Sequence, residues 1–188
     1  MDPLTIRDAK KSDLPRLIAI NRGNLKDSLS HEERKRSGFV LRLYPASLVS
    51  AIMDLEPVLV AEVGEEMAGY LYPTPDYFRE KIPVLRTRLL LLDKVTYQGK
   101  SLSAYKFIEI GMVVVVTAYR QKGVFSRLVE EVERRYKGYE LVLARVALGN
   151  EGSLQAHRRL GFEVVGEGSE GNSRFHVLVK DLRPRSRL

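Results

Sequence analysis

The sequence has no cysteine, and that absence excludes several kinds of chemistry. Disulfide bonds, thiolate metal sites and a cysteine nucleophile all require the thiol that this chain lacks. A thiol-free chain is compatible with a reducing cytosol. The first residues show no signal-peptide pattern, and the longest uncharged run, at 110–119, is about half of the ~18 residues that a membrane span needs. We therefore expect a soluble, cytoplasmic protein with no membrane association.

The remaining composition is that of one folded domain. Of the 188 residues, 44% are hydrophobic and 29% are charged, a balance typical of globular proteins. A chain of this length buries about 70% of its unfolded surface without help from disulfides. We predict a single domain over residues 1–182, with an atypical segment at 73–106 on its substrate side, and a basic tail at 183–188.

The net charge of +7 is unevenly distributed. Three arginines, at positions 183, 185 and 187, belong to the predicted tail. Three further cations, Arg120, Lys122 and Arg127, fall within eight residues that contain no acid. A diffuse basic face would indicate nucleic acid, whereas a local cluster favours a small anionic ligand. An RNA-associated role therefore ranks last among our hypotheses.

Periodic patterns predict a mixed α/β chain. Strands are indicated where apolar residues alternate or run continuously, and helices where they recur every three to four residues. The predicted strands cover 4–7, 58–63, 67–72, 107–116, 139–148, 162–165 and 175–179. The first predicted helix begins at Ser12 or Asp13. Three further helices are predicted at 46–55, 123–137 and 152–160.

Two segments are harder to assign. Three prolines interrupt the start of 73–106, and so long a connection between core strands is more often functional than idle. The aromatic residues in or near it either line a substrate pocket or belong to the core; they are Tyr72, Tyr77, Phe78 and Tyr97. The run 166–171 matches Gly-x-Gly-x-x-Gly formally, but a strand follows it and its two acids would repel a pyrophosphate. We predict a hairpin loop there.

A candidate anion site follows the strand at 107–116. Arg120-Gln121-Lys122-Gly123-Val124 opens an amphipathic helix, and free backbone N–H groups at a helix N-terminus beside cations suit a phosphate or pyrophosphate. It is not a Walker loop. The alternative is a solvated basic turn in which Gly123 serves only the backbone geometry.

A second motif accompanies the first, and together they resemble the GNAT superfamily of acetyl-CoA-dependent N-acetyltransferases. The family motif Gln/Arg-x-x-Gly-x-Gly/Ala follows a central strand, and the run from Arg120 to Phe125 fits five of its six places. The family's second motif is Asn, then Tyr seven residues later, then Gly-Phe; here these places hold Asn150, His157 and Gly161-Phe162. The resemblance implies the GNAT fold, a mixed but mostly antiparallel sheet of about six to seven strands flanked by helices.

The resemblance also implies where coenzyme A binds. In the family the helix N-terminus holds the pyrophosphate, which here implies the amides from about Gln121 to Ser126, with electrostatic help from Arg120, Lys122 and Arg127. The pantetheine arm pairs like an extra strand, which implies Met112, Val113 and Val115 on one side and Asn150 near the other. The implied cofactor-binding set is therefore Met112, Val113, Val115, Arg120, Gln121, Lys122, Gly123, Val124, Phe125, Ser126 and Asn150. Phe125 departs from the family's small residue, and we expect its ring to turn away from the cofactor.

Two residues are candidates for proton transfer. Glu109 is a lone carboxylate in an apolar strand, at the spacing of the general-base glutamate in some histone-modifying members of the family, and burial would raise its pKa. It could instead lie at an exposed strand end or pair with a lysine. His157 stands where the family's general-acid tyrosine stands, and an imidazole can donate a proton near neutral pH. It could instead be a surface or capping histidine.

The sequence thus predicts an N-acetyltransferase that moves an acetyl group from acetyl-CoA to a primary amine by direct attack in a ternary complex. The alternative is a non-catalytic GNAT-like module that binds an acyl-CoA or docks a partner. The three histidines are far apart in sequence and no metal site is indicated. The acceptor, a small molecule or a peptide amine, and a homodimeric assembly stay open.

Overall fold

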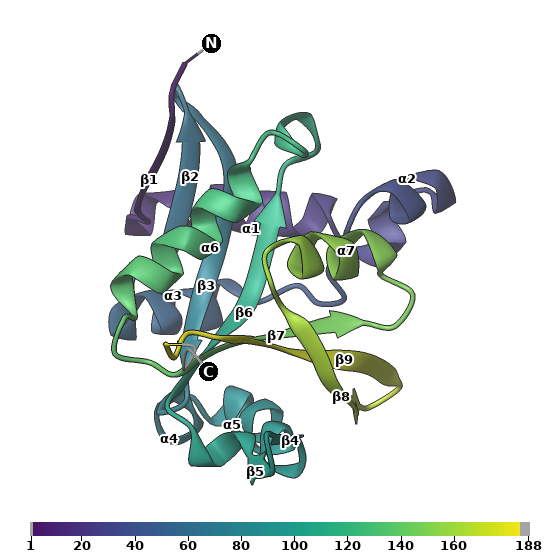
Figure 1. Ribbon diagram of the computed structural model, residues 1–188. Helices are drawn as coiled ribbons and strands as arrows, with labels where there is room; N and C mark the ends of the chain where they lie inside the picture. The colour runs from purple at the N-terminus through teal and green to yellow at the C-terminus, as the bar shows by residue number, and fades with distance from the viewer. Residues whose placement is uncertain (1, 185–188) are drawn as a thin grey trace.

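The computed structural model describes residues 2–184 and is built around one twisted sheet (Figure 1). Among the described residues this sheet has seven strands in the order β1-β2-β3-β6-β7-β9-β8. All neighbouring pairs are antiparallel except β6 and β7, which are parallel. The strands are β1 (Leu4–Asp8), β2 (Leu59–Val63), β3 (Glu66–Pro75), β6 (Phe107–Val115), β7 (Leu141–Ala147), β8 (Glu163–Glu170) and β9 (Ser173–Asp181). The predicted mixed, mostly antiparallel sheet is confirmed.

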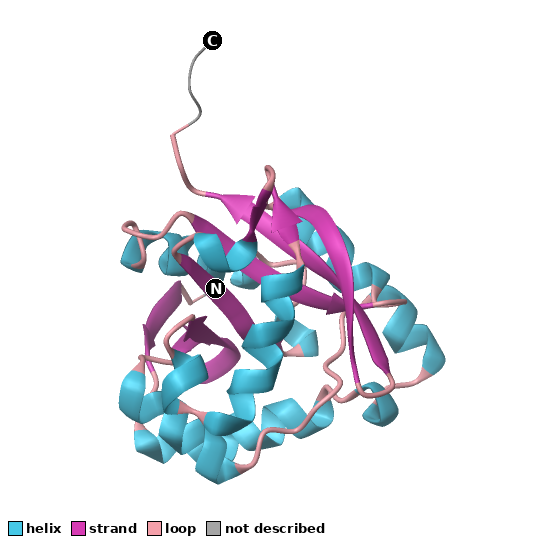
Figure 2. Ribbon diagram, turned by 90° about the horizontal axis from the view of Figure 1, so that it is seen from below, coloured by secondary structure: helices cyan, strands magenta, loops and turns pink. Residues whose placement is uncertain are grey.

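Helices cover both faces of the sheet (Figures 1 and 2). On one face lie α1 (Leu14–Gly23) and α3 (Ala46–Leu55), with the short α2 (His31–Arg36) between them in sequence. The other face carries α6 (Val124–Arg135) and α7 (Glu151–Arg159). The amphipathic pattern of α6 explains its place, since Val124, Leu128 and Val132 recur every four residues and are all buried. Each face of the sheet therefore has its own apolar core.

The strand β6 changes the face to which its side chains point. Ile108 and Ile110 belong to the core beneath α6, whereas Met112 and Val114 belong to the core on the opposite face. All four have even numbers, so the alternation reverses between Ile110 and Met112. The register of β3 against β6 shifts at the same place, which identifies Gly111 as the extra residue of a β-bulge. The bulge lies at the centre of the sheet, where the site is formed.

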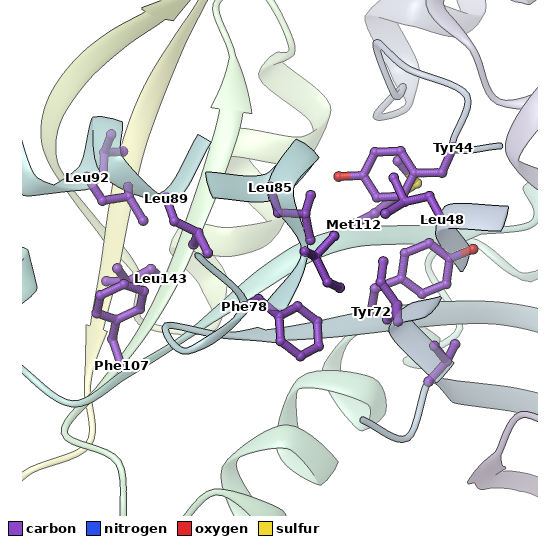
Figure 3. Packing of buried hydrophobic residues seen from close by; sticks show 14 of the residues in the cluster. Tyr44, Leu48, Tyr72, Phe78, Leu85, Leu89, Leu92, Phe107, Met112 and Leu143 are labelled. Atoms are coloured by element: carbon purple, nitrogen blue, oxygen red, sulfur yellow. The ribbon is translucent and has the colours of Figure 1, made fainter. Parts of the chain in front are cut away.

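The segment 73–106 folds as a small unit against the core of α1 and α3. It contains α4 (Phe78–Lys81), α5 (Pro83–Leu90), a 3₁₀ turn at Leu91–Lys94, the hairpin β4 (Thr96–Tyr97) and β5 (Lys100–Ser101), and a second 3₁₀ turn at Leu102–Ala104. Figure 3 shows Phe78, Leu85, Leu89 and Leu92 packed in the same core as Phe107 and Leu143. Tyr72, Phe78 and Tyr97 belong to this core, and Tyr77 bonds to Glu56 at the surface. The core alternative therefore holds for Tyr72, Phe78 and Tyr97 but not for Tyr77, and none of the four lines either of the cavities described below.

The predicted loop at 166–171 is wrong. Strand β8 extends through Glu170 and the chain turns only after it, where Gly171 has φ +57°. Gly166 and Gly168 are needed for close packing instead, since a Cβ at Gly168 would lie 2.6 Å from the Phe175 ring. These glycines had suggested a turn, but they make room for side chains within the sheet.

Arg183, the first residue of the predicted tail at 183–188, is held by neighbouring side chains. The Arg183 guanidinium donates to both carboxylate oxygens of Asp181, at 2.9 and 2.5 Å, and lies 5.1 Å from the Tyr105 ring centroid. Arg185 and Arg187 lie outside the described residues. Within residues 2–184, no helix combines the length and the apolar character that crossing a bilayer requires.

Candidate functional site

The two central parallel strands separate from each other at the bulge. Strands β6 and β7 pair from Phe107 with Leu141 to Ile110 with Ala144, and no further. Beyond that point β7 stays paired with β9 up to Ala147, while Met112–Val115 of β6 stays with β3 (Figure 1). Gly111 lets Thr74 of β3 approach β6 closely at the bulge, since a Cβ there would lie 2.1 Å from the Thr74 hydroxyl oxygen. The backbone edge of β6 beyond the bulge therefore faces an opening rather than a strand.

A groove with a volume of about 730 Å³ occupies this opening. It extends from the splayed strands to the N-terminus of α6, and α7 forms its other wall along the whole length of the helix. Eight of the eleven residues that we predicted to bind the cofactor line it, namely Val113, Val115, Arg120, Gln121, Gly123, Val124, Phe125 and Ser126. Met112 and Asn150 line a neighbouring pocket instead, and Lys122 is in the lining of neither cavity.

The N-terminus of α6 supplies backbone donors to the groove. Gln121 and Gly123 adopt left-handed backbone conformations, with φ +60° and +80°, which turn the chain sharply into the helix. No side chain caps this end. The first backbone amide of α6 that donates a helical hydrogen bond is that of Arg127, whose nitrogen lies 3.0 Å from the Gly123 carbonyl oxygen. The amides of the preceding turn are thus free for an anionic group.

The predicted cations around this turn have different roles. The Arg120 guanidinium points inward and donates to the Asn24 side chain at 2.5 Å and to the Val115 carbonyl at 3.0 Å. Lys122 lies over the Tyr119 ring, 5.6 Å from its centroid, and Arg127 pairs with Glu130 on the exposed side of α6. Arg159 of α7, which we had not predicted, lines the groove. The positive wall is therefore formed by Arg120 and Arg159.

The loop at 37–40 forms a further wall that the sequence did not reveal. Its residues line the groove, and the Asn150 amide nitrogen donates to the Phe39 carbonyl at 2.9 Å. Gly152 lets the loop approach α7 closely, since a Cβ there would lie 2.9 Å from the Ser37 carbonyl carbon. The contacting residues are more than 110 positions apart, so no local pattern could have indicated this wall.

A second, smaller pocket of about 130 Å³ adjoins the groove. The two cavities share the residues Phe39, Val40, Val113, Ser153 and His157, which therefore mark their junction. Beyond the junction the smaller pocket is lined by polar side chains from five segments, namely Arg42, Tyr44, Arg88, Arg145, Asn150 and Glu170. The Asn150 side-chain oxygen is buried and has no hydrogen-bond partner. An unpartnered buried acceptor beside a cavity is suited to a ligand N–H group.

His157 lies at the junction of the two cavities and is only 3% exposed. Burial lowers its pKa to about 4, so the imidazole is neutral at physiological pH. Its Nδ1–H donates to the Ser153 carbonyl at 2.8 Å, which leaves Nε2 as a proton acceptor. The centroid of the Phe125 ring lies 4.8 Å from that of the imidazole, so this side chain packs against His157 in the groove wall.

Glu109 lies behind the smaller pocket and is 1% exposed. Its two carboxylate oxygens accept hydrogen bonds from Arg145 at 2.6 and 3.0 Å. Arg145 lines the smaller pocket, whereas Glu109 lines neither cavity. Of the alternatives left open for Glu109, an ion pair is the one observed, with an arginine rather than a lysine as partner.

Comparison with known proteins identifies the family. The model of the acetyltransferase (GNAT) family matches residues 26–162, which is most of the chain. A comparison with curated protein sequences finds no match. An N-acetyltransferase from Staphylococcus aureus Mu50 is 21% identical in sequence, with a TM-score of 0.61, and the match covers 97% of this chain and 100% of that one.

Two further solved structures share the fold and were determined with ligands. YncA from Salmonella typhimurium, with its cofactor acetyl-CoA, is 21% identical, with a TM-score of 0.59 and coverage of 100% of this chain and 98% of that one. Arabidopsis thaliana NAA60, in complex with a bisubstrate analogue, is 18% identical, with a TM-score of 0.63 and coverage of 95% and 98%. These solved structures share the overall fold of this chain. Because the family model matches most of its length, the chain belongs to the acetyltransferase (GNAT) family.

Proposed function

We propose that this chain is an N-acetyltransferase that moves the acetyl group of acetyl-CoA directly to a primary amine in a ternary complex. The observation that carries the proposal is the meeting of two cavities at His157, one large and lined by backbone donors, the other small and lined by polar side chains. Two substrates that enter from opposite sides of one junction can react there without a covalent enzyme intermediate.

The groove fits acetyl-CoA, the cofactor of the family. The free amides at the start of α6 would hold the pyrophosphate, and Arg120 and Arg159 would add positive charge nearby. The unpaired edge of Met112–Val115 would pair with the amides of the pantetheine arm as a neighbouring strand does. When bound, the cofactor supplies the acetyl group and the thiolate that leaves.

The residues of the junction would handle the protons. Attack requires a neutral amine, and the amine nitrogen must lose a proton as the new bond forms. His157 lines the junction and its Nε2 can accept a proton, so it would take this proton and return it to the leaving thiolate. A histidine with a pKa of about 4 is a weak base but, once protonated, a strong acid, which suits the second step better than the first.

Glu109 is the other candidate for proton transfer. A general base has to reach the amine directly or through one water, and both oxygens of Glu109 are held by Arg145. The contacts favour an indirect role, in which Glu109 fixes Arg145 in the wall of the smaller pocket. Direct base catalysis by Glu109 would require this ion pair to open.

The alternative, a non-catalytic acyl-CoA-binding module, is favoured by two departures from the family pattern, Phe125 in the groove wall and His157 in place of tyrosine. The two proposals share cofactor binding and differ in turnover. Calorimetric titration of acetyl-CoA tests what they share, and a rise in unfolding temperature with acetyl-CoA is an independent check. Incubation with mixed primary amines, with free CoA as the readout, separates them, since only the enzyme releases CoA in proportion to the amine. Absence of acetyl-CoA binding would refute both.

A further inference from the structure

The smaller pocket contains more positive than negative charge. Three arginines line it, at positions 42, 88 and 145, and the carboxylates in or behind its wall are Glu109 and Glu170. Glu109 neutralises Arg145 through two hydrogen bonds. Glu170 accepts a hydrogen bond from Arg42 at 3.1 Å. Glu170 also lies 3.8 Å from Arg88, so the two arginines share one carboxylate and the pocket keeps one positive charge in excess. The surroundings of Arg88 show where this excess is available to a ligand.

Arg88 is largely buried and lacks a hydrogen-bonded carboxylate among the described residues. Its side chain is 15% exposed, and the guanidinium donates to the hydroxyl of Tyr44, above whose ring it lies. The nearest carboxylate oxygen, on Glu170, is 3.8 Å from Nε, beyond hydrogen-bond distance. Nε itself is buried without a partner. The guanidinium stays protonated at any working pH, so the pocket holds a charged donor that the protein satisfies only in part.

The position of Arg88 is fixed from the core of the sheet. Arg145 uses one of its amino groups to donate to the Arg88 backbone carbonyl at 3.1 Å. Glu109 on β6, Arg145 on β7 and Arg88 on α5 thus form one chain of contacts from the sheet to the segment 73–106. The contact to the Arg88 carbonyl fixes the backbone of α5 at this position, and with it the point from which the Arg88 side chain reaches the pocket.

We propose, on the basis of the proposed function, that the acetyl acceptor is a small amine that also carries a carboxylate, and that Arg88 binds this carboxylate. The planar guanidinium fork matches the geometry of a carboxylate and prefers charge-assisted hydrogen bonds. Ile110, Met112 and Phe175 line the same pocket and would contact the carbon chain between the two groups. A polyamine or an aminoglycoside would instead bring further positive charge to a pocket that already has an excess of it.

The test compares amines that differ only in this charge. Glycine, β-alanine and 4-aminobutyrate place the carboxylate at three distances from the amine, and each has a carboxamide counterpart. Initial rates of CoA release are measured for all six and normalised to the concentration of neutral amine. We expect kcat/KM to favour the carboxylate by about 10- to 100-fold for at least one pair, the range of a charge-assisted hydrogen bond.

Substitution of Arg88 tests whether this residue is responsible. Arg88→Gln should remove the preference by raising KM for the carboxylate amine while leaving KM for acetyl-CoA unchanged. Arg88→Lys keeps the charge without the fork and should retain part of the preference. Arg86→Gln is the matched control, since Arg86 lies on the same helix, is exposed, and lines neither cavity. Circular dichroism would show whether each variant is folded.

A binding experiment separates this inference from the proposed function. N-acetylglycine, N-acetyl-β-alanine and 4-acetamidobutyrate, with their carboxamides, are titrated by calorimetry into the CoA-saturated wild-type protein, which requires no turnover. Tighter binding of a carboxylate than of its amide supports the inference even if no amine is acetylated. Equal binding and equal turnover within every pair would overturn it, whereas acetylation without a carboxylate preference would leave the acetyltransferase proposal intact.

Discussion

The groove and the smaller pocket differ in which parts of the chain they present to a ligand. Two walls of the groove offer main-chain groups, namely the unpaired edge of β6 and the uncapped first turn of α6. The smaller pocket is formed by side chains from the loop before α3, from α5, and from β7 and β8. Main-chain donors persist through most substitutions, whereas a side-chain pocket changes with each one. The groove should therefore be robust to mutation, and the pocket should determine which amine is acetylated.

The largest expected effect concerns the ion pair behind the pocket. Glu109→Gln and Arg145→Gln should each reduce the free energy of unfolding by about 3–5 kcal/mol, because each leaves a buried group without its charged partner. Urea unfolding measures the loss. Cofactor affinity should change little in protein that remains folded.

The exposed pair of Glu167 and Arg174 is the control for this comparison. Glu167→Gln should cost about 1 kcal/mol or less, as surface ion pairs do, and an equal cost for Glu109→Gln would contradict the account. Turnover separates the roles of Glu109. If Glu109 acts through Arg145, both buried variants should lose similar activity, whereas a much larger loss in Glu109→Gln would establish it as the base.

The next effect concerns His157, which belongs to both cavities. Its pKa is about 4 in the folded protein against about 6.5 when unfolded, so the unfolded chain binds more protons between these values. The stability that depends on neutral His157 is complete above pH 6.5 and is lost as the pH falls towards 4, by about 3 kcal/mol at most. The difference in unfolding free energy between wild type and His157→Gln, measured from pH 7 to pH 4, should show this slope. His31→Gln, at an exposed position, should not change it, and parallel curves for wild type and His157→Gln would refute the buried neutral imidazole.

A smaller effect distinguishes cofactor affinity from stability within the groove. Ser126→Asp places a carboxylate among the free amides of α6, where it should stabilise the helix by about 0.3–1 kcal/mol. The same charge should weaken acetyl-CoA binding by about 10- to 100-fold, since it competes with the pyrophosphate for the same donors. Ser126→Asn is the neutral control of similar size and should stay close to wild type. Unchanged affinity in Ser126→Asp would show that the pyrophosphate binds elsewhere.

The smallest effect compares two arginines near the groove. Arg159 lines it, whereas Arg127 pairs with Glu130 on the exposed side of α6. Arg159→Gln should weaken acetyl-CoA binding about 2- to 5-fold, the range of one partly screened charge, and the effect should diminish with added salt. Arg127→Gln should have no measurable effect on calorimetric affinity. The reverse result would restore the role that the sequence suggested for Arg127.

The part of the groove that could be predicted from the sequence is the N-terminus of α6, because its features are local. The turn at Gly123 and the apolar face of α6 occupy consecutive residues, and the helix at 46–55 was predicted with the observed bounds. The bulge at Gly111 was not predicted, because the strand around it is apolar on both faces and shows no alternation to interrupt. The ion pair of Arg145 with Glu109 was not predicted, because neither strand's sequence shows which residues of β6 and β7 lie side by side.

The smaller pocket could not be predicted because its residues meet only in the folded chain. Tyr44, Arg88 and Glu170 lie far apart in the sequence, and Arg88 lies in a helix with no clear amphipathic pattern. The same holds for the loop at 37–40, whose position depends on a hydrogen bond from Asn150. Features that depend on long-range packing can be identified only from the structure, whereas features that depend on one turn of backbone can be identified from the sequence.

The most direct test of the central claim measures initial rates of CoA release over a matrix of acetyl-CoA and amine concentrations. The account predicts amine-dependent release that saturates with both substrates, with reciprocal plots that intersect, as expected for a ternary complex formed at the junction of two cavities. Acetyl-CoA that binds tightly but is released as CoA at the same rate with and without any amine would contradict it.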